Sequence, residues 1–164
     1  MLNVVLVEPE IPANAGNIAR TCAASGTRLH MVRPFGFSLD DKNLKRAGLD
    51  YWHLLDICYY DNFQQVLDAF SESPFFYATT KGGQVYTDVS FPDESFLVFG
   101  KETKGLPEEL LRRYPEQCVR IPMVEGARSL NLSNSVAIVL YEALRQNSFQ
   151  NMKLFGKLKG IEIG

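Results

Sequence analysis

Three clusters of glycine, asparagine, serine and arginine contain the residue types that bind ligands through backbone and side-chain polar groups. The first, residues 14–20, reads Asn-Ala-Gly-Asn-Ile-Ala-Arg. It would place free backbone N–H groups at the start of a helix and Arg20 in its second turn, an arrangement suited to a phosphate group. A capped helix with an exposed arginine has the same pattern, so this cluster alone leaves both interpretations open.

The second cluster, residues 99–107, reads Phe-Gly-Lys-Glu-Thr-Lys-Gly-Leu-Pro. Its glycines have the spacing of a phosphate-binding loop, but Leu106 and Pro107 stand where such a loop has Lys and Ser or Thr. That disfavours a nucleoside-triphosphate site, and the lack of G-x-G-x-x-G after the first apolar run disfavours an ordinary dinucleotide site. Gly100 and Gly105 allow close backbone approach to a flat ligand such as adenine, or a tight turn before a helix.

The third cluster is the most specific, and it runs from Ile121-Pro122-Met123 to Ser129-Leu130-Asn131-Leu132-Ser133-Asn134. Its hydroxyl and amide side chains crowd the start of an apolar helical pattern. One of them suffices to cap the helix, so the others are available to a ligand.

Short apolar runs alternate with helical patterns along the chain. We expect strands at residues 2–7, 29–32, 57–60, 75–79, 96–99 and 119–122. We expect helices from Asn14, as N-cap, to a stop at Gly26, and at residues 63–70, 107–113 and 134–146. This order predicts a three-layer α/β/α domain with a mostly parallel sheet, formed by residues 1–164 without an appended domain. The three clusters follow strands, where ligands bind in such sheets.

Composition excludes several other classes of protein. The 164 residues are 46% hydrophobic and 22% charged, unlike a disordered chain or a coiled coil. No apolar run is long enough to span a bilayer, and the N-terminus lacks the basic region of a signal peptide. The three scattered cysteines and two histidines form no metal-binding pattern. We therefore expect a cytoplasmic protein with reduced thiols and no metal.

The net charge of −2 argues against indiscriminate nucleic-acid binding, but the charge is unevenly distributed. Residues 20–46 contain six basic and two acidic residues, and residues 145–164 contain four and one. Residues 47–80 contain five acidic residues and no Lys or Arg. Two basic segments that shared one face would form a local positive surface.

In their order and spacing, the three clusters resemble motifs 1, 2 and 3 of the SPOUT superfamily of RNA methyltransferases. The whole chain is similar to its minimal TrmL (YibK-like) branch of tRNA 2′-O-methyltransferases, including residues 8–12 and 46–51. Small departures are Lys101, Lys104 and Leu130, which stand where Pro, Arg and Met are frequent. They concern details of binding and leave the reaction class unchanged.

The resemblance implies 2′-O-methylation of the ribose at the wobble nucleotide of tRNA, position 34, a cytidine or modified uridine, with S-adenosylmethionine as methyl donor. It also implies a C-terminal deep trefoil knot and a homodimer whose active sites lie at the subunit interface and receive the tRNA anticodon arm. Methylation of ribosomal RNA ribose and a non-catalytic knotted RNA-binding protein are the alternatives.

The resemblance also implies roles for individual residues. The expected cofactor-binding residues are Ala78, Gly100, Glu102, Ile121, Met123, Ser129 and Leu130. The expected catalytic residues are Arg20, Asn17, Ser129 and Asn134. Arg20 is either the base that removes the ribose proton or a clamp on a phosphate that relays it, and the second role suits a group that is normally protonated. Tyr141 and Phe35 are candidates for stacking on bases, although both also suit a core.

Overall fold

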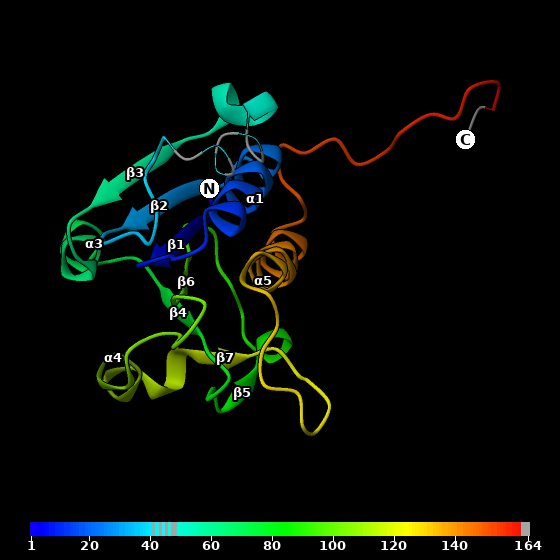
Figure 1. Ribbon diagram of the computed structural model, residues 1–164. Helices are drawn as coiled ribbons and strands as arrows, with labels where there is room; N and C mark the ends of the chain where they lie inside the picture. The colour runs from blue at the N-terminus through cyan, green and yellow to red at the C-terminus, as the bar shows by residue number, and fades with distance from the viewer. Residues whose placement is uncertain (41, 43, 45, 47–48, 162–164) are drawn as a thin grey trace.

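The fold is built on one parallel sheet (Figure 1). The computed structural model describes residues 1–40, 42, 44, 46 and 49–161. Seven strands lie in the order β3-β2-β1-β6-β4-β7-β5, and every paired neighbour is parallel. The strands are β1 (Asn3–Val7), β2 (Arg28–Val32), β3 (Ile57–Tyr60), β4 (Phe75–Ala78), β5 (Gln84–Val85), β6 (Phe96–Phe99) and β7 (Cys118–Arg120). The predicted mostly parallel sheet is confirmed, with β5 as an unpredicted addition.

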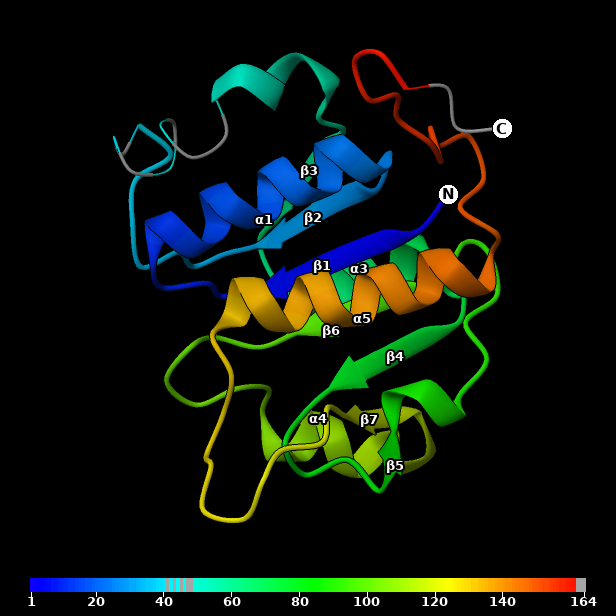
Figure 2. The ribbon, with the colours of Figure 1, turned by 90° about the vertical axis from the view of Figure 1, so that its right-hand side faces the viewer.

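Helices cover both faces of this sheet. The α-helices whose bounds lie in the described part of the chain are α1 (Pro12–Ser25), α3 (Phe63–Ala69), α4 (Glu108–Arg113) and α5 (Leu132–Gln146), and the 3-10 helices there are η1 (Leu49–Leu54), η2 (Tyr86–Asp88) and η3 (Pro115–Gln117). Figure 2 shows α1 and α5 side by side on one face, and their buried residues share one core cluster. Residues of α3 and α4 belong to a second cluster on the other face. The predicted three-layer arrangement is confirmed.

The sequence of β1 explains why both faces are covered. All five of its residues are buried. Val4 and Leu6 pack in the cluster shared with α1 and α5, whereas Val5 and Val7 pack in the cluster shared with α3 and α4. Because successive side chains of a strand point to opposite faces, an unbroken apolar run produces two cores.

The starts of the two long helices differ from the predictions. Asn14 is not the N-cap of α1: the helix begins at Pro12, a residue that favours the first helical position, and Ile11 occupies the cap without a side-chain hydrogen bond. The helix α5 begins at Leu132 because the Asn131 side chain accepts hydrogen bonds from the backbone N–H groups that follow it. The predicted stop of α1 at Gly26 is confirmed by its left-handed φ of 67°.

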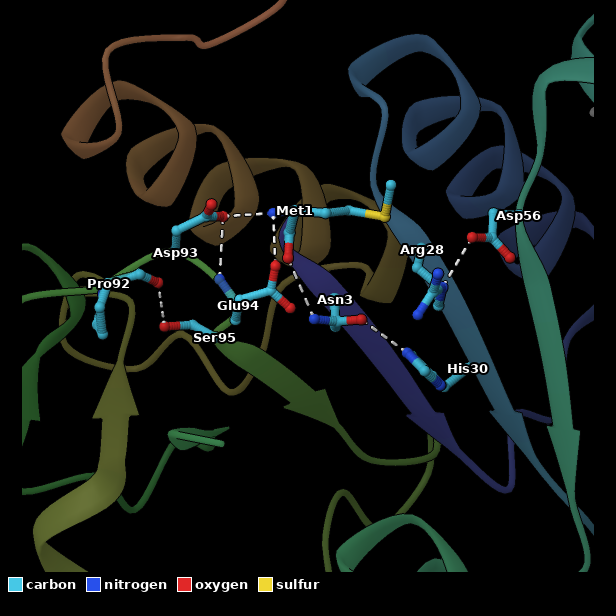
Figure 3. A network of polar contacts seen from close by, with 9 residues as sticks. All are labelled: Met1, Asn3, Arg28, His30, Asp56, Pro92, Asp93, Glu94 and Ser95. Carbon is cyan, nitrogen blue, oxygen red and sulfur yellow. Dashed lines mark hydrogen bonds and ion pairs between the residues drawn. The ribbon is translucent and has the colours of Figure 1, made fainter. Parts of the chain in front are cut away.

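Polar groups at the amino ends of the strands are paired with one another (Figure 3). The N-terminal ammonium of Met1 lies 2.6 Å from an oxygen of Asp93. Below it, Nε2 of the buried His30 lies 2.9 Å from Oδ1 of Asn3, and Nδ1 lies 2.8 Å from the hydroxyl of Tyr60. Burial lowers the pKa of His30 to about 4, so the ring is neutral at pH 7.

After α5, Phe149 and Met152 still pack against the core, and the rest of the C-terminal segment then leaves the body of the molecule, as Figure 1 shows. It is rich in exposed apolar side chains, with Phe155 83% and Leu158 61% accessible. None of the described helices has the length and apolar character needed to cross a membrane. The predicted family-like stretch 46–51 includes Ala47 and Gly48, which lie outside the described residues.

Candidate functional site

A cavity of about 550 Å³ opens at the carboxyl ends of β4, β6 and β7. Loops that follow these strands form its walls together with the first turn of α5. All seven residues expected to bind the cofactor line it, namely Ala78, Gly100, Glu102, Ile121, Met123, Ser129 and Leu130. Its volume lies in the range of small-molecule sites, and its position is the usual one for ligands in doubly wound sheets.

One wall of the cavity is backbone folded against backbone. A Cβ placed on Gly100 would lie 2.1 Å from the carbonyl carbon of Gly105 and 2.2 Å from the nitrogen of Leu106. Gly105 itself has a φ of 66°, and its N–H donates to the carbonyl of Lys101 at 2.9 Å. Both glycines are therefore required by a tight turn, which is one of the two interpretations that the sequence left open.

The carboxylate of Glu102 connects the first two clusters. It accepts hydrogen bonds from the backbone N–H groups of Glu10, at 2.8 Å, and Ile11, at 3.1 Å. It also accepts one from the side-chain amide of Asn14, at 3.3 Å. The amide oxygen of Asn14 accepts in turn from Asn131 at 3.1 Å, which adds the third cluster. A single network thus joins residues far apart in the sequence.

Sequence reasoning missed the positions of Asn14 and Asn131 in this network. Both residues belong to the clusters, but the sequence predicts Asn14 as a helix N-cap and Asn131 as one of several groups that cap α5 or bind a ligand. Asn131 is indeed the cap of α5, whereas Asn14 lies buried inside α1 with its amide facing Glu102. A buried asparagine in an otherwise apolar stripe of a helix is the signal that could have found it, because a buried amide needs partners.

A second contact locks the same loops together. The carboxylate of Glu10 accepts hydrogen bonds from the backbone N–H and the hydroxyl of Thr103, at 3.1 and 2.7 Å. These bonds, with smaller contributions from nearby Lys101 and Lys104, lower the pKa of Glu10. Glu102 therefore binds the backbone of residues 10–11, and Glu10 in turn binds Thr103 in the loop that carries Glu102.

The third cluster divides its polar groups between capping and the cavity. Asn131 caps α5, and the hydroxyl of Ser133 donates to its side-chain oxygen at 2.6 Å. Ser129 and Asn134 are exposed, and their side chains form no hydrogen bond with any residue that the structure describes. Ser129 lines the cavity and Asn134 does not. Both side chains are therefore without a partner among the described residues, and their role in binding a ligand stays a prediction.

Arg20 and Asn17 lie outside the cavity, on the exposed face of α1. They are three residues apart, so they are neighbours on that face. The guanidinium carbon of Arg20 lies 4.6 Å from the centroid of the Tyr51 ring. Within one chain, then, three of the four expected catalytic residues, Arg20, Asn17 and Asn134, stand on the exposed faces of α1 and α5, and only Ser129 lines the cavity.

Four cations surround the cavity, and two of them are paired. Lys81 forms an ion pair with Glu108, and Lys101 lies 3.9 Å from Glu8. Lys104 and Arg128 also line the cavity but form no ion pair with the described part of the chain. No cluster of His, Cys, Asp and Glu among the described residues could hold a metal ion.

Comparison with known proteins identifies the family. The model of the SpoU rRNA Methylase family matches residues 1–141. The chain belongs to the SpoU methylase family. This SpoU methylase is 50% identical over 147 residues to a tRNA (cytidine(34)-2′-O)-methyltransferase of Escherichia coli K12, covering 89% of this chain and 94% of the relative.

Solved structures agree with this assignment. One, described as giving structural insights into 2-OH methylation of C/U34 on tRNA, is 46% identical with a TM-score of 0.86, covering 90% of this SpoU methylase and 97% of that chain. Another is a SpoU methyltransferase of Streptomyces viridochromogenes in complex with AdoMet, 26% identical with a TM-score of 0.78. That match covers 90% of this chain and 61% of the other.

Proposed function

We propose that this SpoU methylase transfers a methyl group from S-adenosylmethionine to the ribose 2′-hydroxyl of the wobble nucleotide, position 34, of tRNA. The observation that carries the proposal is that all the residues expected to bind the cofactor line one and the same cavity. The names of close relatives and the AdoMet complex of a more distant one support the same reaction and cofactor.

The residues present fit S-adenosylmethionine. Ala78, Ile121 and Leu106 supply apolar surface for the faces of adenine, and the backbone of the loop at Gly100 supplies groups that can read its edge. The free hydroxyl of Ser129 is suited to orient the methionine end or the ribose. The cofactor supplies an electrophilic methyl group on sulfur. The protein supplies alignment and removal of one proton from the attacking hydroxyl.

Arg20 acts in this proposal as a clamp on a phosphate of the RNA. Its guanidinium is exposed and lies over the ring of Tyr51, a contact that favours a cation. The charged guanidinium would hold a phosphate oxygen that takes the proton of the 2′-hydroxyl. In the same step the ribose oxygen would bond to the methyl carbon and the sulfur–methyl bond would break, with S-adenosylhomocysteine as the leaving product. The alternative, in which Arg20 itself is the base, requires a neutral guanidine at an exposed position, which is the less favourable state.

The active site is completed by a second copy of the chain. Arg20, Asn17 and Asn134 lie outside the cavity of their own chain. They lie on α1 and α5, which run side by side (Figure 2), and α5 also exposes Ile138 and Tyr141 by 36% and 41%. We propose that this face forms the homodimer interface and brings Arg20 to the partner's cavity. We further propose that residues 1–164 form one cytoplasmic domain with a C-terminal trefoil knot.

The basic segments 20–46 and 145–164 would supply the surface for the tRNA anticodon arm. Of their basic residues, Lys45 lies outside the described part of the chain, so the proposal rests on the charge of these segments in the sequence. Binding through phosphates releases counterions. We therefore expect added salt to weaken tRNA binding steeply and to leave cofactor binding nearly unchanged, which filter binding and calorimetry would measure.

The decisive experiment incubates the protein with labelled S-adenosylmethionine and either bulk tRNA or ribosomal RNA, and then maps the modified nucleotide. We expect label on the ribose of nucleotide 34. Label only in ribosomal RNA would replace the proposed substrate while keeping the chemistry. A protein that binds RNA but shows no cofactor binding by calorimetry would be the non-catalytic alternative.

A further inference from the structure

Arg20 is held by an aromatic ring rather than by an acid. It stands exposed on α1 and makes no hydrogen bond or ion pair with a described residue. The centroid of the Tyr51 ring lies 4.6 Å from its guanidinium carbon, well within the range of a cation–π contact. Tyr51 is a half-buried residue of η1, and η1 packs against α1. The position of the ring is therefore fixed by the same helix that carries Arg20.

We propose that Tyr51 is the positioning residue for Arg20: its ring face fixes the guanidinium at the point where the RNA arrives and leaves the charge and the N–H donors free. The inference deepens the proposed function and rests on the proposed role of Arg20. It assigns to Tyr51 no contact with the reacting atoms.

Two other arginines of the chain are paired with carboxylates, and they show how such a pairing differs from the ring contact of Arg20. The guanidinium of Arg145 donates two hydrogen bonds of 2.9 Å to the carboxylate of Glu142. Arg28 donates to Asp56 at 2.7 Å. A carboxylate orients a guanidinium well, but it neutralises the charge and occupies donors that a phosphate would need. An aromatic face attracts the cation through its quadrupole and leaves the donor edge of the guanidinium free.

A second arginine on aromatic rings shows that the pairing at Arg20 is distinctive. Arg33 lies 5.6 Å from the Phe35 centroid and 5.4 Å from the Tyr59 centroid, but it also lies 3.8 Å from Asp61. Arg20 has the shorter ring distance and no such acid among the described residues. The pair Arg33 and Tyr59 is thus a natural control.

Positioning of this kind should affect the turnover rate and leave cofactor binding unaffected. A free arginine side chain samples many rotamers, and this freedom is lost when the side chain is fixed. Tyr51 limits that freedom before RNA binds, so less is lost when the phosphate is clamped in the transition state. Neither Tyr51 nor Arg20 lines the cofactor cavity.

The test compares the full-length variants Tyr51→Phe and Tyr51→Leu with the parent protein. We expect Tyr51→Phe, which keeps the ring, to retain kcat for tRNA methylation within about twofold. Tyr51→Leu should lower kcat by about 3- to 30-fold, the range expected for loss of a cation–π contact. The dissociation constant for S-adenosylmethionine, measured by calorimetry, should be unchanged in both. Tyr59→Leu, the same substitution beside Arg33, should leave kcat unchanged.

Several results would overturn the proposal. If Tyr51→Phe loses as much activity as Tyr51→Leu, the hydroxyl matters and the ring face does not. If Tyr51→Leu turns over at the parent rate while the parent methylates nucleotide 34, the positioning role fails and the proposed function stands. If the parent methylates no RNA, both fall together. Should Tyr51→Leu unfold, Tyr51→Met fills similar space without a ring and is held to the same expected loss of kcat.

Discussion

The two ends of the sheet use similar polar residues in opposite ways. At the amino ends of the strands, charged and polar groups are paired with each other: Met1 with Asp93, and His30 with Asn3 (Figure 3). At the carboxyl ends, Ser129 remains without a hydrogen-bond partner among the described residues. Paired polar groups stabilise a fold, whereas unpaired ones beside a cavity can bind something else.

The carboxyl end is itself divided between bracing and binding. Hydrogen bonds join the side chains of Glu102, Asn14 and Asn131. They connect the loop after β6 to α1 and to the start of α5, and leave these groups paired like those at the amino ends. Around them, Ser129, Asn134 and Arg20 stay exposed. A rigid frame that carries free groups is what a site needs to align reactants. Substitutions in the free groups should therefore affect chemistry, and substitutions in the paired groups should affect stability.

The largest expected effect belongs to Arg20→Ala. Loss of the guanidinium should lower methyl transfer by about 100-fold or more, since a donor aimed at developing charge is removed. Cofactor affinity and thermal stability should stay close to the parent values, because Arg20 lies on the surface and outside the cavity. Single-turnover rates with tRNA and calorimetry with S-adenosylmethionine measure the two quantities. Full turnover in the variant would remove Arg20 from the mechanism.

Acid should destabilise the protein through His30, on the amino-end side of the comparison. Its pKa is about 4 in the fold, against 6.5 for an exposed histidine, because burial disfavours the charged ring. Between pH 6.5 and pH 4, His30 is protonated in the unfolded chain but neutral in the folded chain. Stability is therefore full above pH 6.5 and falls as the pH drops toward 4, by up to about 3 kcal/mol.

Urea unfolding at several pH values between 7 and 4 would measure that loss. In His30→Gln, which cannot titrate, this part of the pH dependence should vanish, although the variant starts from a lower stability. An identical slope in both proteins would show that other groups cause the loss. Hydrogen bonds from Arg145 and Gln146 lower the pKa of Glu142 to about 2, so its contribution begins to be lost only near pH 4.5, the ordinary value for this group, and it is lost equally in His30→Gln.

A smaller effect is expected for Glu102→Gln, which tests the brace at the carboxyl end. The amide can accept on one side only, so at least one backbone N–H of the 10–11 segment loses its partner. We expect the free energy of unfolding to fall by about 2 kcal/mol. Weaker cofactor binding should accompany the loss, since the loop lines the cavity. Glu125→Gln, on an exposed turn, is the matched control and should change neither quantity.

The smallest effect is expected for Asp93→Asn at the opposite end. Asp93 pairs with the N-terminal ammonium, and this contact lowers the pKa of Asp93 and raises that of the ammonium. Both partners are half exposed, so solvent screens the pair and its loss should cost less than about 1 kcal/mol. Thermal unfolding and methyl transfer should both remain near the parent values. A large loss of activity would contradict the assignment of stability to the amino ends of the strands and of chemistry to their carboxyl ends.

Sequence reasoning was most successful where local pattern decides structure. The run at residues 2–7 predicted a buried strand, observed as Asn3–Val7, and the glycine at 26 predicted a helix stop. It failed where the structure of a segment depends on a residue or strand far away in the sequence. The strand β5, Gln84–Val85, has no pattern of its own and exists through its pairing with β7. Likewise, nothing near Asn14 indicates that its amide meets Glu102, 88 positions away.

The site shows the same division. The residues around the cavity could be named because three motifs mark them in the sequence. The contact between Arg20 and Tyr51 could not, since it depends on how η1 folds over α1. Neither residue type nor spacing predicts a ring at that place. Contacts between a motif and a segment without one are therefore where structure adds most to sequence.

The backbone turn at Gly100 has a consequence for engineering cofactor selectivity. No side chain can be added there without moving the main chain at Gly105 and Leu106, so this wall offers no route to a reshaped site. Ala78 and Met123 are side chains that face the same cavity. Acceptance of methyl-donor analogues with bulkier transferable groups should be sought by changing these residues, with the glycine turn kept as an invariant template.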